Sequence, residues 1–193
     1  MEALKPFEEI LEADIRQQSF VKLTEQGKFE NNTLRDFYNC AKARELHDGV
    51  PERIRNHFQT ARHLLIYAWF YYPFHVTAMF HALVTAEFAL KLRAGSQRGG
   101  FERLLKQAIQ NGWIRDEGFA HGRHIKERLK RQREEGKVFG HEYPEVESYC
   151  TTLLRVLPFL RNELAHGTSM LHNESPKWLR ICADLINQLF PKP

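Results

Sequence analysis

Apolar residues recur three and four positions apart along almost the whole chain. That spacing gathers them on one face of an α-helix, which completes a turn every ~3.6 residues. No segment shows a sustained alternation of apolar and polar residues next to the residue pairs typical of hairpin turns. The pattern therefore predicts an all-α fold in which several helices form a bundle.

Glycines, prolines and capping residues divide this pattern into a series of predicted helices. The helices are expected at about residues 7–26, 34–47, 51–70, 74–94, 101–112, 123–137, 145–166 and 176–190. No internal repeat, low-complexity tract or linker interrupts the series. We therefore expect one all-helical domain over residues 1–193.

The composition excludes several classes of protein. The three cysteines, Cys40, Cys150 and Cys182, are odd in number and lack a CxxC pair, so neither a disulfide framework nor a structural zinc module is expected. The N-terminal segment carries acidic residues where a signal peptide needs a basic and then an apolar region. A cytoplasmic location is the expectation.

Residues 64–90 are the most apolar part of the chain, but polar residues and a proline interrupt them. A membrane span needs roughly 20 consecutive apolar residues, so we assign this stretch to the core and expect no membrane association. The net charge is +4 and the pI is about 9.0. This mildly basic balance is compatible with a polyanionic partner without requiring one.

The predicted helix 145–166 has one apolar face and a polar cluster at its end. The apolar face consists of residues that step by four and three: Val146, Cys150, Leu153, Leu157, Leu160 and Leu164. At about 100° per residue, Arg161 lies on the flank of this face, and Asn162 and His166 lie roughly opposite it. Asn162 and His166 are four residues apart, so they lie one above the other on the same surface.

This cluster has two interpretations. In the first, Gly167 ends the helix, His166 binds the last carbonyl groups, and Arg161 and Asn162 are ordinary solvated residues. In the second, the cluster handles phosphate. A guanidinium binds phosphate with two donors, and an imidazole that titrates near neutral pH gives or takes a proton beside it.

Two segments resemble the HEPN superfamily. Residues 161–167 read Arg-Asn-Glu-Leu-Ala-His-Gly, and the family signature has an arginine with a polar neighbour and a histidine about four to six residues later. Residues 86–91 read Ala-Glu-Phe-Ala-Leu-Lys, which is similar to a segment on an earlier helix of many members. The resemblance rests on these short motifs within an all-helical chain.

The resemblance implies a HEPN-like helical bundle that forms a two-fold homodimer and acts as a metal-independent endoribonuclease. Such proteins function in toxin–antitoxin, phage-defence or RNA-processing systems, so RNA, a second copy and an antitoxin or other protein are the implied partners. Arg161 and His166 would be the catalytic pair, with Asn162 as the supporting polar residue. The alternative is a catalytically silent HEPN-like module that binds a nucleotide, RNA or a protein.

Cleavage of RNA without a metal uses the 2′-hydroxyl as the nucleophile and leaves a 2′,3′-cyclic phosphate and a 5′-hydroxyl. The step requires a base, an acid and a cation that stabilises the phosphorane. His166 can act as base or acid, and Arg161 as the cation. DNA lacks the nucleophile and is expected to resist.

Glu87 also has two interpretations. It is four residues before Lys91 in the order that favours a helical ion pair. The resemblance suggests that it instead holds Arg161, as an acidic residue on an earlier helix does in some relatives, and would then belong to the catalytic group.

The predicted helix 123–137 is rich in basic residues, among them Arg123, Lys126 and Lys130. These side chains are candidates for RNA-backbone contacts, and a solvated face of mixed charge is the alternative. The histidines form no HExxH motif and no tetrahedral ligand set with cysteines or carboxylates. We therefore expect no metal and no cofactor.

Overall fold

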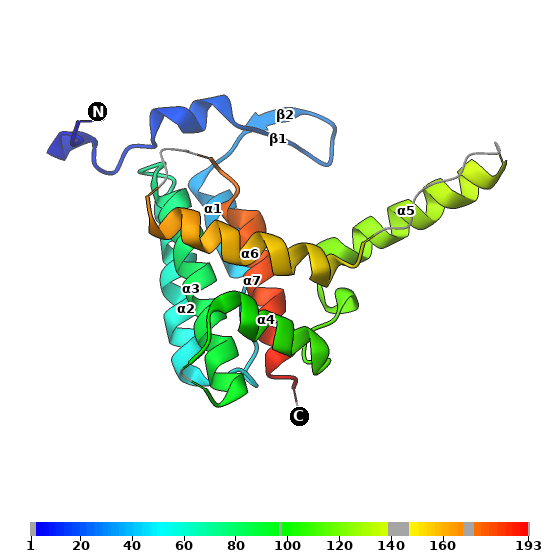
Figure 1. Ribbon diagram of the computed structural model, residues 1–193. Helices are drawn as coiled ribbons and strands as arrows, with labels where there is room; N and C mark the ends of the chain where they lie inside the picture. Colours follow the sequence, from blue (N-terminus) through cyan, green and yellow to red (C-terminus); the bar gives the residue numbers. More distant parts are fainter. Residues whose placement is uncertain (1–2, 97, 139–146, 168–171, 193) are drawn as a thin grey trace.

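The computed structural model describes residues 3–96, 98–138, 147–167 and 172–192, which are mostly helical (Figure 1). This mostly helical secondary structure confirms the predicted all-α class. The α-helices in these ranges are α1 (Leu34–Lys42), α2 (Glu52–Tyr67), α3 (Phe74–Ala94), α4 (Phe101–Gln110), α5 (Ala120–Val138), α6 (Tyr149–Ala165) and α7 (Ser175–Leu189). None of the described helices is both long and apolar enough to cross a membrane.

The predicted helix 7–26 is wrong. Two short 3₁₀ turns, η1 (Phe7–Glu9) and η2 (Ile15–Ser19), precede an antiparallel hairpin of β1 (Val21–Leu23) and β2 (Phe29–Asn31). The hairpin turn contains Gly27 at φ +76°. Most of the apolar residues that suggested a helix remain exposed, so no continuous buried face stabilises a helix here.

Helix α1 begins where the sequence predicts. Thr33 and Asp36 form a capping box in which the Thr33 hydroxyl accepts the Asp36 N–H at 3.3 Å and an Asp36 oxygen accepts the Thr33 N–H at 2.7 Å. Lys22 of the hairpin donates to the same carboxylate at 2.6 Å, which ties the hairpin to α1. The helix ends at Lys42, earlier than the predicted boundary at His47.

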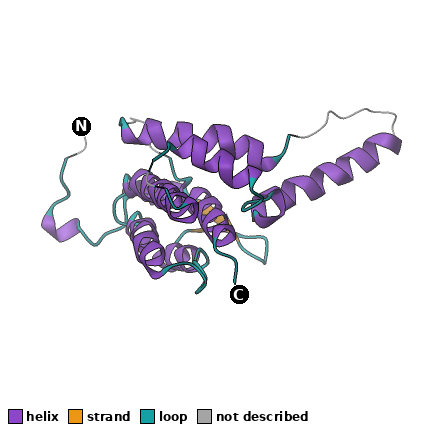
Figure 2. Ribbon diagram, turned by 60° about the horizontal axis from the view of Figure 1, so that its bottom comes forward, coloured by secondary structure: helices purple, strands orange, loops and turns teal. Residues whose placement is uncertain are grey.

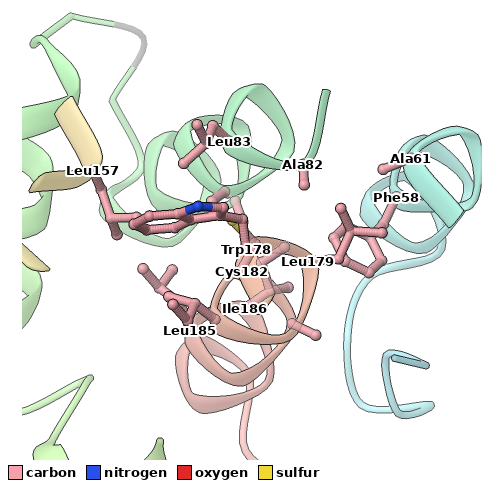
Figure 3. Close-up of a cluster of buried hydrophobic side chains, with 14 of the residues drawn as sticks. Phe58, Ala61, Ala82, Leu83, Leu157, Trp178, Leu179, Cys182, Leu185 and Ile186 are labelled. Atoms are coloured by element: carbon pink, nitrogen blue, oxygen red, sulfur yellow. The ribbon is translucent and has the colours of Figure 1, made fainter. Parts of the chain in front are cut away.

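Helix α3 matches its predicted range and ends at Gly95, whose φ of +63° is easily reached only by glycine. Its neighbours pack on it through small and large apolar side chains. Figure 3 shows α7 at the centre of this packing. Side chains of α7 meet side chains of α2, α3 and α6, including Trp178, Leu179, Cys182, Leu185 and Ile186 of α7, Phe58 and Ala61 of α2, Ala82 and Leu83 of α3, and Leu157 of α6.

Helix α6 begins at Tyr149, later than the predicted start near 145, and residues 145–146 lie outside the described ranges. Asp116 of the turn η3 (Asp116–Gly118) caps it: the carboxylate accepts the N–H groups of Tyr149 at 3.0 Å and Cys150 at 2.9 Å, and the Ser148 hydroxyl at 2.8 Å. These bonds satisfy amide groups that the helix itself leaves unpaired. They fix the start of α6 beside the start of α5.

Helix α5 projects away from the other helices in both views (Figures 1 and 2). The basic segment is helical as predicted, although α5 begins at Ala120, three residues before the predicted start.

Candidate functional site

The end of α6 has the form that the sequence predicts. The last helical residue is Ala165, the His166 N–H donates to the Asn162 carbonyl at 3.0 Å, and Gly167 has a left-handed φ of +85°. A glycine at this position ends a helix without steric cost. The motif therefore lies on the last turn of the helix, with His166 as the residue that follows its last helical position.

The faces of α6 agree with the periodicity. Cys150, Leu153 and Leu157 are buried and Leu160 and Leu164 are partly buried, whereas Val146 lies outside the described residues. Arg161 lies at the edge of the buried face, with 33% of its side chain exposed. Asn162 and His166 are exposed on the opposite side.

Glu87 of α3 forms ion pairs with both of the partners that the sequence suggested, Arg161 and Lys91. Its Oε2 lies 3.0 Å from Nη2 of Arg161, and its Oε1 lies 2.8 Å from Nζ of Lys91. The carboxylate is 8% exposed, so both ion pairs are shielded from most of the solvent. The helical pair and the contact with Arg161 are thus both present, and the three charges sum to one positive charge.

Two further donors of Arg161 have defined surroundings. Nη1 donates to Oδ1 of Asn162 at 3.1 Å, so the polar neighbour bonds to the guanidinium. Nε is buried and has no hydrogen-bond partner among the described residues. The imidazole of His166 is exposed one turn further on. Among the residues that the structure describes, it makes no hydrogen bond to Arg161 or Asn162.

Phe159 also belongs to this surface, and it was not among the residues predicted from the sequence. Its side chain is 64% exposed, and it lies three and seven residues before Asn162 and His166. Those separations place the three side chains on one face of α6. The signal in the sequence was an aromatic residue outside the apolar stripe of its own helix.

The three basic candidates on α5 do not lie beside the motif within one chain. Arg123 and Lys130 are exposed, and the side chain of Lys126 falls outside the described set. The start of α5 lies next to the start of α6, where Asp116 accepts the Tyr149 N–H. Arg161 is twelve residues beyond Tyr149 on α6, which is about 18 Å at the helical rise. A role for these residues with the same RNA molecule stays a prediction.

Within the described ranges, no three or more His, Cys, Asp or Glu side chains form a group that could hold a metal ion. The expectation of a metal-independent site stays a prediction, to be tested by experiment.

Comparisons with known proteins give no relative from which a function can be carried over: no family model, curated protein or solved structure matches the chain. The resemblance to the HEPN superfamily therefore rests on the two short motifs alone.

Proposed function

We propose that the protein is a HEPN-like, metal-independent endoribonuclease that cleaves RNA through its 2′-hydroxyl. The observation that carries this proposal is the arrangement at the end of α6: Glu87 holds Arg161, Asn162 contacts the guanidinium, and His166 is exposed one turn away. The cation and the imidazole that metal-free phosphodiester cleavage uses thus lie near each other at the end of α6, and Glu87 of the packed helix α3 holds the cation.

Arg161 supplies the positive charge. A guanidinium is protonated at every physiological pH and presents planar donors that match the non-bridging oxygens of a phosphate. Glu87 neutralises part of this charge, but Lys91 shares the same carboxylate and leaves the cluster with one net positive charge. The cluster therefore still attracts a phosphodiester and stabilises the extra negative charge of the phosphorane.

His166 transfers protons. As base it takes the proton of the 2′-hydroxyl while the 2′-oxygen forms its bond to phosphorus; as acid it gives a proton to the 5′-oxygen while the bond from phosphorus to that oxygen breaks. The products are a 2′,3′-cyclic phosphate and a 5′-hydroxyl. One imidazole performs one of these transfers at a time, so a second copy of His166 would supply the other.

A two-fold homodimer supplies that second imidazole. Phe159 leaves an exposed aromatic ring on the same face as Asn162 and His166, and a second copy packed on this face would bury that ring at the centre of the interface. Pairing of this face with its own copy would bring two motifs to one cleft, as an isologous interface requires.

A catalytically silent module is the second candidate, and one observation favours it. Both terminal nitrogens of Arg161 already have partners, Glu87 for Nη2 and Asn162 for Nη1. A guanidinium committed to protein partners has fewer donors for a phosphate. Under this alternative the end of α6 would bind a nucleotide, RNA or a protein without cleaving it.

Incubation of purified protein with mixed RNAs in EDTA separates the two candidates. The endoribonuclease predicts fragments with 2′,3′-cyclic phosphate ends from the wild type, and a loss of about 100-fold or more in rate for His166→Ala. His63→Ala, which alters an exposed histidine on α2, is the matched control and should cleave like the wild type. Absent cleavage, or equal cleavage by all three proteins, would exclude the nuclease.

Expression in cells tests the proposed place in a toxin–antitoxin or phage-defence system. Wild-type protein that arrests growth, together with a harmless Arg161→Ala variant present at the same level, is the expected outcome. Equal tolerance of both proteins would favour the binding module.

A further inference from the structure

A cavity of about 220 Å³ lies between the N-terminal segment, α1 and the starts of α3 and α7. At ~30 Å³ per water molecule, it has room for roughly seven waters or one small ring system. Its described lining combines aromatic rings with neutral polar side chains, among them Phe20, Phe37, Gln17, Asn32, Asn173 and His75.

His75 is one of the lining residues, and it carries a polar atom without a hydrogen-bond partner among the described residues. The residue is 2% exposed, and its Nδ1 lies 2.6 Å from the Ser175 hydroxyl oxygen. Its Nε2 is buried and has no hydrogen-bond partner among the described residues. A buried polar atom without a partner is costly, so a ligand that displaces the neighbouring lining side chains and bonds to Nε2 would remove that cost.

The cavity favours an uncharged ligand. Burial lowers the pKa of His75 to about 4, an effect to which nearby His172 adds, so the imidazole is neutral at physiological pH. Asp36 is the one charged side chain in the described lining, and Lys22 and Thr33 already bind its carboxylate. Neither a strong anion nor a strong cation would find a free countercharge there.

The lining also favours a flat ligand with mixed hydrogen-bonding groups. The rings of Phe20 and Phe37 offer surfaces for stacking or edge contacts with another ring. The carboxamides of Gln17, Asn32 and Asn173 each carry both a donor and an acceptor, although Gln17 already donates to the Ala68 carbonyl at 2.9 Å. Such a combination of rings and amides matches a planar heterocycle that both gives and accepts hydrogen bonds.

We propose that this cavity is a binding site for a nucleobase, with His75 Nε2 as the buried polar contact. The base could belong to a free nucleoside or to an RNA strand, because the recognised group is the same. The site is separate from the end of α6: His75 and Glu87 are twelve residues apart on α3, about 18 Å along the helix. The proposal does not depend on cleavage and survives if the protein has no nuclease activity.

Calorimetric titration tests the proposal. The ligands are the four ribonucleosides and four short RNA strands, each of which contains a single kind of base. Two variants of the cavity should lower the affinity at least about tenfold: His75→Phe, which keeps a ring and removes both nitrogens, and Asn173→Trp, which fills the cavity from an exposed position. His63→Phe makes the same change on an exposed surface of α2 and should bind like the wild type.

The second cavity variant keeps the test valid if His75→Phe does not fold. If nucleosides bind the wild type and not the cavity variants, the ligand is a free nucleoside. If only RNA strands bind the wild type, and the cavity variants lose that binding, the ligand is a base within a strand. The proposal is overturned if no nucleoside or RNA binds, if the cavity variants bind equally well, or if uncharged aliphatic amides bind as tightly. Dependence on phosphate, seen as binding of nucleotides and inorganic phosphate but not of nucleosides, would also overturn it.

Discussion

Glu87 and Arg161 join α3 to the end of α6 through an ion pair of 3.0 Å between Oε2 and Nη2. The same carboxylate binds Lys91, its neighbour one turn away on α3. Glu87 is therefore well placed to fix the orientation of the guanidinium without contacting a substrate itself. In the proposed nuclease, this makes Glu87 a positioning residue rather than a catalytic one.

Glu87→Gln should lower the rate of RNA cleavage about tenfold or more, because a displaced guanidinium aligns poorly with the phosphate. Lys91→Gln is the comparison variant: it breaks the pair between Glu87 and Lys91 and removes one positive charge from the cluster, but it keeps the pair with Arg161, so its loss should be the smaller one. Single-turnover kinetics on one RNA measure both variants. A larger loss in Lys91→Gln than in Glu87→Gln would contradict the positioning role.

Asp116→Ala should destabilise the fold by about 0.5–2 kcal/mol, the range measured for the loss of a helix cap. Burial raises the pKa of Asp116, but hydrogen bonds from Cys150, Ser148 and Tyr149 together outweigh burial and hold it below its ordinary value. The ionised carboxylate therefore stabilises the fold above a pH of about 4, and this contribution disappears as the pH falls through the lowered pKa.

Urea unfolding of the wild type and Asp116→Ala across this pH range checks the prediction. The difference in free energy of unfolding should be constant near neutral pH and shrink in acid. A difference that grows as the pH falls would show that the cap does not act through its charge.

His75 should make the fold less stable in mild acid. Its pKa is about 4 in the folded protein and about 6.5 in an unfolded chain, so the unfolded state binds the extra proton between these values. Stability should fall as the pH decreases from about 6.5 to 4, by up to ~3 kcal/mol from this residue. His75→Phe should unfold with a flatter pH profile, while His63→Phe should keep the wild-type slope.

Phe159→Lys should weaken a homodimer formed through the end of α6, with the dissociation constant raised at least about tenfold by a buried charge and a lost ring. Thr151→Lys adds the same charge at an exposed position near the start of α6 and should leave the assembly unchanged. Light scattering after size-exclusion chromatography measures both masses. A wild type that is monomeric at all concentrations would contradict this interface.

The sequence predicted the elements whose signals are local. Helix α3 has strong apolar content, a proline before it and a glycine after it, and both of its ends were correct. The end of α6 was also correct because Gly167 follows the motif directly. The position of Arg161 on the flank of the apolar face followed from the helical period alone.

The sequence did not predict features that depend on distant contacts. Residues 7–26 have a helical period, but most of their apolar side chains are exposed and meet no core, so short turns and a hairpin form instead. The late start of α6 depends on Asp116, 33 residues before Tyr149 in the chain. The sequence left two partners open for Glu87, and only the packing of α3 against α6 shows that it binds both.

The most direct measurement compares cleavage of one RNA with cleavage of the same strand carrying a single 2′-deoxy nucleotide at the mapped site, both in EDTA. The account predicts rapid cleavage of the RNA by the wild type, almost none of the substituted strand at that site, and cleavage of the RNA by His166→Ala that is slower by about 100-fold or more. Cleavage that continues at the 2′-deoxy position, or that proceeds at the wild-type rate in His166→Ala, would contradict it.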